Sequence, residues 1–282
     1  MIDGRRSAVL NAARMAPPDI SVAIPAYNEA ARLPSFVDAL VAACEAHPRG
    51  PVVQFLVSDD GSRPEQAAVH RETVDRATAR LTAARSPHAF TYLSATRNGG
   101  KGSAIRRAWG QADAGAAWLA FLDADGAVGA AEFFRVGALT LASGVDVVAG
   151  SRVKMAGRTV ERDLFRHLQG RIFATVAERR LQLGFYDTQC GMKFFRADLL
   201  RPLLPSLREE RWLLDLELLA RLRTAGARTL EVPIDWAEPG ASKVVPGLDA
   251  VKMLWGILQL GRRLDRTPYG EQAPEPLPPR TP

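Results

Sequence analysis

Short apolar runs alternate with longer segments of helical periodicity through the first half of the chain. The strand-like runs are residues 20–24, 52–57, 90–93 and 117–122, separated by helix-like segments at 33–45, 64–84 and 101–113. Apolar runs of this length are typical of strands that are buried on both faces, and the intervening helices indicate βαβ units. The pattern therefore predicts an α/β fold, with a Rossmann-like, mainly parallel sheet flanked by helices.

A polar segment follows each of the four strand-like runs. These segments are Pro25–Glu29, Ser58–Ser62, Arg97–Gly102 and Asp123–Asp125. The carboxyl ends of parallel strands lie at one edge of a sheet, and open α/β sheets bind their ligands at that edge. We therefore expect the four segments to meet there and to form a ligand site.

The pair Asp123 and Asp125 is the strongest chemical signal. A single residue separates them, so both carboxylates can reach one hard cation such as Mg²⁺ or Mn²⁺, which prefers oxygen ligands and phosphates. An ordinary surface turn is the alternative, because Asp and Gly are common turn residues. The position of the pair after a buried strand favours the metal site.

The other segments carry groups that suit a nucleotide. The ring of Tyr27 can stack on a base, and the carboxylates of Glu29 and Asp60 can accept hydrogen bonds from a base or a ribose. The glycine-rich segment 97–102 opens a helix, where free N–H groups and Lys101 would attract phosphate. Turn formation and helix capping are the alternatives. The segment matches neither a Walker A loop nor a dinucleotide fingerprint, so neither an ATPase nor a dehydrogenase is supported.

Composition narrows the class of protein. Of the 282 residues, 47% are hydrophobic and 24% charged, which is typical of a folded globular protein. The net charge of +6 comes without a dense Lys/Arg block, so nucleotides or phospholipids are favoured as partners and nucleic acid is not. Two distant cysteines indicate a reducing compartment, and no apolar run is long enough to span a bilayer. These features predict a cytoplasmic protein.

The second half of the chain adds further candidate residues. Arg152 follows a short apolar run, which would bring it to the same edge, while Asp215 and Glu217 lie too close in sequence to share a helix face. Segments 164–176 and 248–264 are amphipathic helices with broad apolar faces and nearby arginines. Such faces either pack against the domain or lie in a membrane interface.

Taken together, the motifs resemble those of inverting glycosyltransferases of family 2, which have the GT-A fold. The resemblance is to the dolichyl-phosphate β-glucosyltransferases, with the dolichyl-phosphate mannose synthases next. It rests on 25–29, 59–62, 98–104, 123–127, 150–152, 187–191, 210–217 and 240–243. Ala127 follows the glucosyl pattern, since mannose synthases commonly carry Gln there. The implied organisation is an N-terminal extension (1–18), a transferase domain (19–265) with nucleotide-binding (19–126) and acceptor-binding (127–265) halves, and a disordered Pro-rich tail (266–282).

The resemblance implies a role for each matching residue. The residues that would hold the base and ribose are Pro25, Tyr27, Glu29 and Asp60. Lys101 would approach the diphosphate, Asp123 and Asp125 would bind the donor and Mg²⁺ or Mn²⁺, and Arg152 would face an acceptor phosphate. Those bordering the sugar and its leaving group would be Gln189, Asp215 and Lys243. The residues expected to act in catalysis are Asp125, Arg152, Asp215 and Lys243.

The expected reaction moves a hexose to a polyprenyl phosphate or another lipid at the cytosolic face of a membrane. The expected donor is UDP-glucose, and GDP-mannose is the alternative. A phosphate monoester is already anionic at neutral pH and needs cations rather than a base. A hydroxyl acceptor would instead need a carboxylate base, for which Asp215 is the candidate. The third hypothesis is a nucleotide-sugar-binding protein without transfer activity, or a nucleotidyltransferase.

Overall fold

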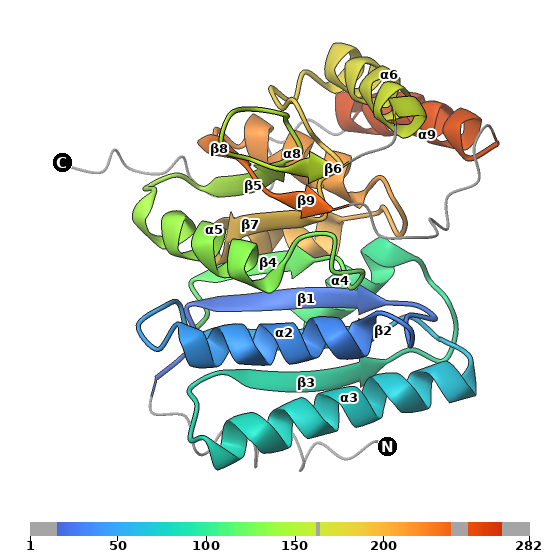
Figure 1. Cartoon of the computed structure of the whole chain (residues 1–282). Coiled ribbons are helices and arrows are strands. Elements are labelled where there is room, and N and C mark those ends of the chain that lie inside the picture. The colour runs from blue at the N-terminus through green and yellow to red at the C-terminus, as the bar shows by residue number, and fades with distance from the viewer. Residues whose placement is uncertain (1–15, 162–163, 238–247, 267–282) are drawn as a thin grey trace.

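The computed structural model describes residues 16–161, 164–237 and 248–266, which form a sheet with helices on both faces (Figure 1). The sheet has seven strands in the order β3–β2–β1–β4–β7–β5–β8. Strand β7 runs antiparallel to β4 and β5, and the other neighbouring pairs are parallel. The predicted α/β fold with a mainly parallel sheet is confirmed.

The strands of the main sheet are β1 (Ile20–Ala26), β2 (Val53–Asp59), β3 (Ala89–Ser94), β4 (Trp118–Leu122), β5 (Val147–Ser151), β7 (Met192–Arg196) and β8 (Thr229–Pro233). A separate parallel pair joins β6 (Val160–Glu161) and β9 (Trp236–Ala237). The helices are α2 (Leu33–Ala46), α3 (Pro64–Ala83), α4 (Lys101–Trp109), α5 (Ala130–Ala142), α6 (Leu164–Leu181), α7 (Ala197–Leu200), the 3₁₀ helix η1 (Arg201–Ser206), α8 (Leu214–Thr224) and α9 (Leu248–Arg266).

The helix expected at residues 101–113 is shorter in the structure. Helix α4 ends at Trp109 rather than at residue 113, because Gly110 weakens its continuation and the buried Trp109 indole N–H donates to the Ala120 carbonyl at 2.8 Å. Helix α8 begins only at Leu214, so Asp215 lies in its first turn. The expected extension 1–18 and tail 266–282 lie almost entirely outside the described residues.

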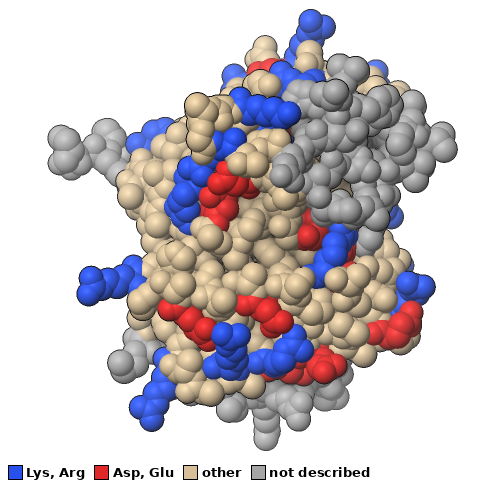
Figure 2. All heavy atoms as spheres, in the orientation of Figure 1, with Lys and Arg blue, Asp and Glu red and all other residues tan. Residues whose placement is uncertain are grey.

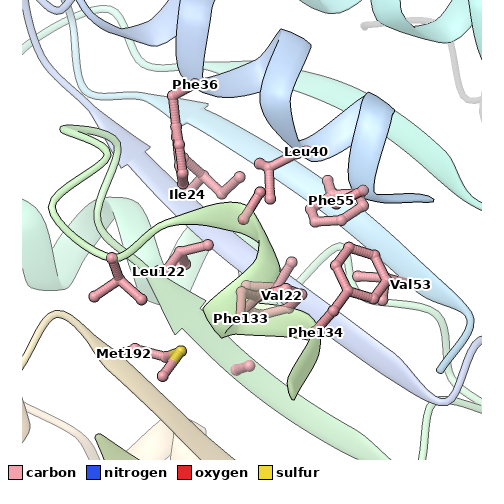
Figure 3. Close-up of a cluster of buried hydrophobic side chains, with 14 of the residues drawn as sticks. Val22, Ile24, Phe36, Leu40, Val53, Phe55, Leu122, Phe133, Phe134 and Met192 are labelled. Atoms are coloured by element: carbon pink, nitrogen blue, oxygen red, sulfur yellow. The ribbon is translucent and has the colours of Figure 1, made fainter. Parts of the chain in front are cut away.

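Alternate residues of each central strand enter two separate cores. Val22 and Ile24 of β1 pack with Phe36 and Phe133 under α2 and α5, as Figure 3 shows. Ala23, between them, belongs to the second core, which α4, α6, α8 and α9 cover. Burial on both faces explains why the strands read as continuous apolar runs rather than as alternating ones.

The order of the strands has a switch point beside β1. The chain passes from β1 to β2 and β3 on one side, then returns to the other side of β1 as β4. Such a switch point separates the loops that follow β1 and β4, and ligands of open α/β sheets bind there. Because β7 is antiparallel, the residues just before it also lie at this edge.

Helices α6 and α9 pack against each other away from β1, at the top of Figure 1. Ile257 and Leu260 of α9 are buried in the second core, whereas Trp255 and Leu258 are 55% and 42% exposed. The C-terminal helix therefore packs against the domain on one side and keeps an apolar remainder at the surface. Among the described residues, none of the helices has the length and apolar character needed to span a membrane.

Candidate active site

The polar segments that follow β1 to β4 meet at one edge of the sheet. The N–H of Asp60 donates to the Ala26 carbonyl at 2.8 Å, and the Asp60 carboxylate in turn accepts the N–H of Gly100 at 2.6 Å. Lys101, the next residue, forms an ion pair with Asp123 at 2.7 Å. This continuous chain of contacts joins all four segments, as their positions after parallel strands predict.

Asp123 is held by the turn that precedes β7. Its N–H donates to the Gly191 carbonyl at 2.9 Å, and its carboxylate lies against the Cα of Gly191. A Cβ at position 191 would stand 2.3 Å from Asp123 Oδ2, so a larger residue would displace the carboxylate. The turn before the antiparallel strand thus fixes the first residue of the Asp-x-Asp pair.

Asp125 is less well satisfied than its neighbour. Its Oδ1 accepts the N–H of Ala127 at 3.0 Å. Burial, followed by the negative charge of Asp123, raises the pKa of Asp125 above its ordinary value. The two carboxylates therefore repel each other across Ala124, and a cation beside them would relieve that repulsion.

Two lysines, one fully buried and one partly buried, approach the same aromatic ring from different elements. Lys101 Nζ from α4 lies 5.1 Å from the centre of the Phe121 ring, and Lys193 Nζ from β7 lies 5.2 Å from it. Lys193 is fully buried, donates to the Cys190 carbonyl at 2.8 Å and lies 3.5 Å from Asp215 Oδ2. Burial acts to lower the pKa of Lys101, but the negative charges of Asp123 and Asp215 outweigh burial, so the pKa is raised. The result is a compact cluster of opposite charges beneath the site.

Asp60 differs from these carboxylates because its oxygens are already engaged. They accept the N–H groups of Gly99 at 3.1 Å and Gly100 at 2.6 Å, and Arg107 Nη2 donates to Oδ1 at 3.2 Å. Gly100 has a φ of +99°, a conformation that a residue with a Cβ rarely adopts. Asp60 thus shapes the glycine-rich loop below Lys101, which leaves it little capacity for a base or ribose.

The segment after β1 presents one exposed ring. Tyr27 is 40% exposed, and Pro25, near the end of β1, is half-buried. Glu29 is nearly buried and accepts the Nε–H of Arg32 at 2.7 Å. Tyr27 is therefore available for stacking, whereas the Glu29 carboxylate is already paired with a cation.

Arg152 lies at the edge but is tightly paired. Its Nε and Nη2 donate to the two oxygens of Asp187 at 2.7 and 2.8 Å, and its backbone N–H donates to the same carboxylate at 3.0 Å. Burial acts to raise the pKa of Asp187, but the charge and hydrogen bonds of Arg152 outweigh burial and lower this pKa to about 2. Arg152 Nη1 has no hydrogen-bond partner among the described residues, and this nitrogen is the part of the fork that a ligand can still reach.

The remaining expected residues fall into three situations. The amide nitrogen of Gln189 is buried and has no partner within the described ranges. Asp215 is buried beside Lys193, and Glu217 points elsewhere, accepting the N–H groups of Arg208 and Glu209 at 2.9 and 2.8 Å. Lys243 lies outside the described residues. Asp215 and Glu217 therefore face different surroundings, as their spacing in the sequence predicts.

Comparison with known proteins agrees with the geometry of the site. A model of glycosyl transferase family 2 matches residues 21–204. The chain belongs to this family. A dolichyl-phosphate beta-glucosyltransferase of Dictyostelium discoideum is 26% identical over 86% of this chain and 73% of its own length. One from Drosophila melanogaster is 29% identical over 87% of this chain and 73% of its own length.

A solved structure shares the fold of this family 2 glycosyltransferase. Glucosyl-3-phosphoglycerate synthase from Mycobacterium tuberculosis, in complex with Mn²⁺, UDP and glucosyl-3-phosphoglycerate, superposes with a TM-score of 0.56. The sequences are 18% identical over 94% of this chain and 85% of that one. The GT-A fold expected from the motifs is therefore confirmed.

In this glycosyltransferase, the carboxylates of Asp123 and Asp125 fit a hard divalent cation. Asp123 and Asp125 supply carboxylate oxygens one residue apart, and burial together with the charge of Asp123 raises the pKa of Asp125. No cluster of three or more His, Cys, Asp or Glu side chains suited to a metal is found within the described part of the chain. A cation that relies on two carboxylates takes its other ligands from water and substrate phosphates.

Sequence reasoning missed Lys193 and the partners of two site residues. A lysine inside the strand Met192–Arg196, flanked by apolar residues, is a signal that was available, because a buried lysine needs a charged or polar partner. The pairing of Arg152 with Asp187 and of Asp60 with Arg107 had no such signal, since each joins residues far apart in sequence.

Proposed function

We propose that this family 2 glycosyltransferase transfers glucose from UDP-glucose to a polyprenyl (dolichyl-type) phosphate, with inversion at the anomeric carbon. The observation that carries the proposal is the Lys101–Asp123 ion pair beside Asp125 at the switch point, where a diphosphate would meet both cation and metal ligands. The names of the two relatives, each matched over most of its length, support the glucosyl donor and the dolichyl-phosphate acceptor.

The donor would lie across the switch point with its base towards Tyr27 and its diphosphate towards Lys101. Tyr27 supplies an exposed ring for stacking, with Pro25 and Glu29 forming the floor and side of the loop. Asp60 contributes to donor binding indirectly, by holding the loop of Gly99 and Gly100. The buried amide nitrogen of Gln189 supports its role as a donor to a sugar hydroxyl.

Asp123 and Asp125 would hold Mg²⁺ or Mn²⁺, and the solved neighbour with Mn²⁺ and UDP supports this expectation. A divalent cation bound there supplies neutralisation of the charge that develops on the departing nucleotide. Lys101 adds a fixed positive charge on the same side, and its raised pKa keeps it protonated at neutral pH. We propose the same for Lys243, which sequence alone assigns to the leaving group.

An acceptor phosphate needs a cation to orient it rather than a base to activate it. Arg152 is suited to that task because Asp187 fixes its planar fork through Nε and Nη2 and leaves Nη1 to the ligand. Asp215 lies 3.5 Å from Lys193, so its charge is balanced by an ammonium group. We infer that Asp215 organises the lysines and is not an obligatory base.

A lipid acceptor requires the site to approach a membrane, and we propose that the protein binds the cytosolic face peripherally. Ile172 of α6 and Trp255 and Leu258 of α9 are exposed on two helices that pack together. Arg179 and Arg180 end α6 and would attract anionic lipids. Sedimentation with anionic liposomes should fall with rising salt and with Trp255→Ser, whereas Leu141→Ser, at an exposed leucine of α5, should leave sedimentation unchanged.

The decisive assay incubates the purified protein and Mg²⁺ or Mn²⁺ with UDP-glucose or GDP-mannose and a short-chain polyprenyl phosphate. Mass spectrometry should detect a glucosylated lipid phosphate with UDP-glucose, and none when the lipid carries a free alcohol instead. Transfer from GDP-mannose alone would move the assignment to mannosyl transfer. Transfer to an alcohol that disappears in Asp215→Asn would instead make Asp215 the base for a hydroxyl acceptor.

A further inference from the structure

The loop after β1 is anchored by side chains from the segment that begins helix α3. Three consecutive backbone N–H groups of the loop each donate to a different side chain of that segment. They are Asn28 to Ser62 Oγ at 2.9 Å, Glu29 to His70 Nε2 at 3.1 Å, and Ala30 to Gln66 Oε1 at 3.1 Å. The loop also contains Asn28 at a φ of +51°, in the left-handed region that residues other than glycine seldom occupy. Its conformation is therefore imposed from α3.

His70 is the buried member of these three anchors. Its side chain has no exposed surface, and its Nδ1 lies 2.6 Å from Asp59 Oδ2. Since Nε2 accepts the N–H of Glu29, that nitrogen carries no hydrogen, and Nδ1 donates to the carboxylate. His70 is thus a neutral imidazole with its hydrogen on Nδ1. Asp59 is the ionised acceptor, because hydrogen bonds from His70 and Ser62 outweigh its burial and lower its pKa.

We propose that His70 is a positioning residue for the nucleotide-binding loop and that it holds the loop only while it is neutral. Protonation would place an Nε2–H against the N–H of Glu29, so that two donors would face each other and the anchor would be lost. Tyr27, two residues before Glu29, would then lose its fixed position. The inference rests on the proposed function, in which this loop receives the base of the donor.

Several charged and titratable groups from neighbouring elements surround His70. Burial, followed by the charge of Asp59, raises the pKa of Tyr92 on β3 to about 12. Arg71 of α3 lies 4.6 Å from the centre of the Tyr92 ring and stays charged, and Glu29 is paired with Arg32. Histidine is the side-chain type here that changes charge between about pH 5 and 8. Protonation of His70 in acid should therefore lower the affinity for the donor.

Two substitutions separate the anchoring role from the titration. In His70→Gln, the amide oxygen can reach the position of Nε2 and accept the N–H of Glu29 without titrating. In His70→Asn, the shorter amide can donate to Asp59 but stops short of Glu29. Gln66→Leu is the matched control, because it removes the neighbouring anchor at Ala30 and leaves His70 in place.

The first measurement is the Kd of UDP by calorimetry from pH 5.5 to 8, with kcat and donor KM beside it. The wild type and Gln66→Leu should lose affinity towards low pH, while His70→Gln should bind equally across the range. At pH 8, His70→Asn should bind UDP about 2- to 12-fold more weakly than the wild type, which corresponds to one net hydrogen bond. Its donor KM should rise while kcat at saturating donor stays unchanged. The same pH dependence in His70→Gln and the wild type would overturn the proposal.

A second measurement does not depend on the donor. Nitrogen-15 NMR of the imidazoles at pH 8, with the His70 signals assigned by their absence from His70→Gln, should show the hydrogen on Nδ1. The Glu29 amide hydrogen should exchange slowly in the wild type and in His70→Gln and faster in His70→Asn. A hydrogen on Nε2, or equal exchange in all three proteins, would refute the anchor. Wild-type protein that fails to bind UDP at pH 8 would contradict the proposed function, and the exchange rates would then decide the anchor alone.

Discussion

The acidic turns at the ends of β2 and β4 look alike in sequence but differ in how their carboxylates are satisfied. Asp60, after β2, is buried and accepts two backbone N–H groups and a guanidinium N–H. Asp125, after β4, accepts one backbone N–H and lies beside the like charge of Asp123, so that its pKa is raised. Two turns of similar composition therefore stand in opposite electrostatic situations.

This difference separates carboxylates that build the site from the carboxylates that we propose bind its ligand. A carboxylate whose hydrogen-bonding capacity is filled by the protein stabilises the fold and has little left for a substrate. A carboxylate kept close to a like charge is held at a cost, and a bound cation relieves that cost. The Asp-x-Asp pair belongs to the second kind, and Asp60 and Asp187 belong to the first.

The largest expected effect tests the under-satisfied turn. Asp125→Asn should lower kcat/KM for transfer by about 1000-fold, since metal-assisted charge stabilisation is worth several kcal/mol. Folding should not suffer, because the raised pKa means that the folded protein disfavours the ionised carboxylate that the substitution removes. Kinetics and thermal unfolding at pH 7 measure the two effects. Full activity of the wild type in EDTA would contradict the role of the pair.

The opposite result is expected at the satisfied turn. Asp60→Asn should destabilise the protein by about 3 kcal/mol, because it removes a buried carboxylate and leaves the partly buried Arg107 guanidinium without its charge partner. Asp38→Asn is the control, since its exposed pairing with Arg76 at 3.5 Å should contribute less than about 1 kcal/mol. Urea unfolding measures both variants. Equal stability of the two would remove the distinction drawn between the turns.

Acid should act on the two kinds of carboxylate with opposite sign. The pKa of Asp187 falls to about 2 in the folded protein, so its stabilisation is complete above the unfolded value of about 4 and is lost as the pH falls from there towards 2. Roughly 2.5 kcal/mol is at stake. The stability difference between the wild type and Asp187→Asn should shrink across this window. The pKa of Asp125 is raised in the folded protein, so protonation favours folding. The stability of the wild type relative to Asp125→Asn should therefore rise as the pH falls.

The smallest effect concerns the buried pair beneath the site. Lys193→Met leaves the buried Asp215 carboxylate without its ammonium neighbour, and Asp215→Asn leaves the reverse. The double variant should recover part of the lost stability, with a coupling energy of about 1 to 2 kcal/mol at this 3.5 Å separation. A double-mutant cycle by urea unfolding measures it. Strict additivity would mean that the two charges do not support each other.

The sequence predicted the fold and the presence of the site, but not which side chains pair with each other inside it. Asp123, Asp125 and Lys101 were predictable because each follows a recognisable strand or begins a helix, and parallel strands share an edge. Local patterns say nothing of a partner dozens of residues away. Arg107 therefore could not be assigned to Asp60, and Asp187 could not be assigned to Arg152.

The same limit explains why position in the sequence did not show which of these side chains are already paired. Arg152 reaches the expected edge, yet Asp187 engages most of its fork. The hydrogen bonds of His70 with Asp59 and Glu29 join three separate segments, so no single window of sequence displays them. Burial and hydrogen-bond capacity are properties of the folded chain, and they decide which polar residues remain available to a ligand.

Gly191 has a consequence for how this sequence can diverge. Any side chain at this position would collide with the Asp123 carboxylate and turn it away from Lys101, although no charge would change. A lineage could therefore lose the activity through one neutral-looking replacement that leaves the Asp-x-Asp motif intact. Among descendants of this chain, the residue at position 191 would distinguish active proteins from inactive ones. A search for the Asp-x-Asp motif alone would not separate the two.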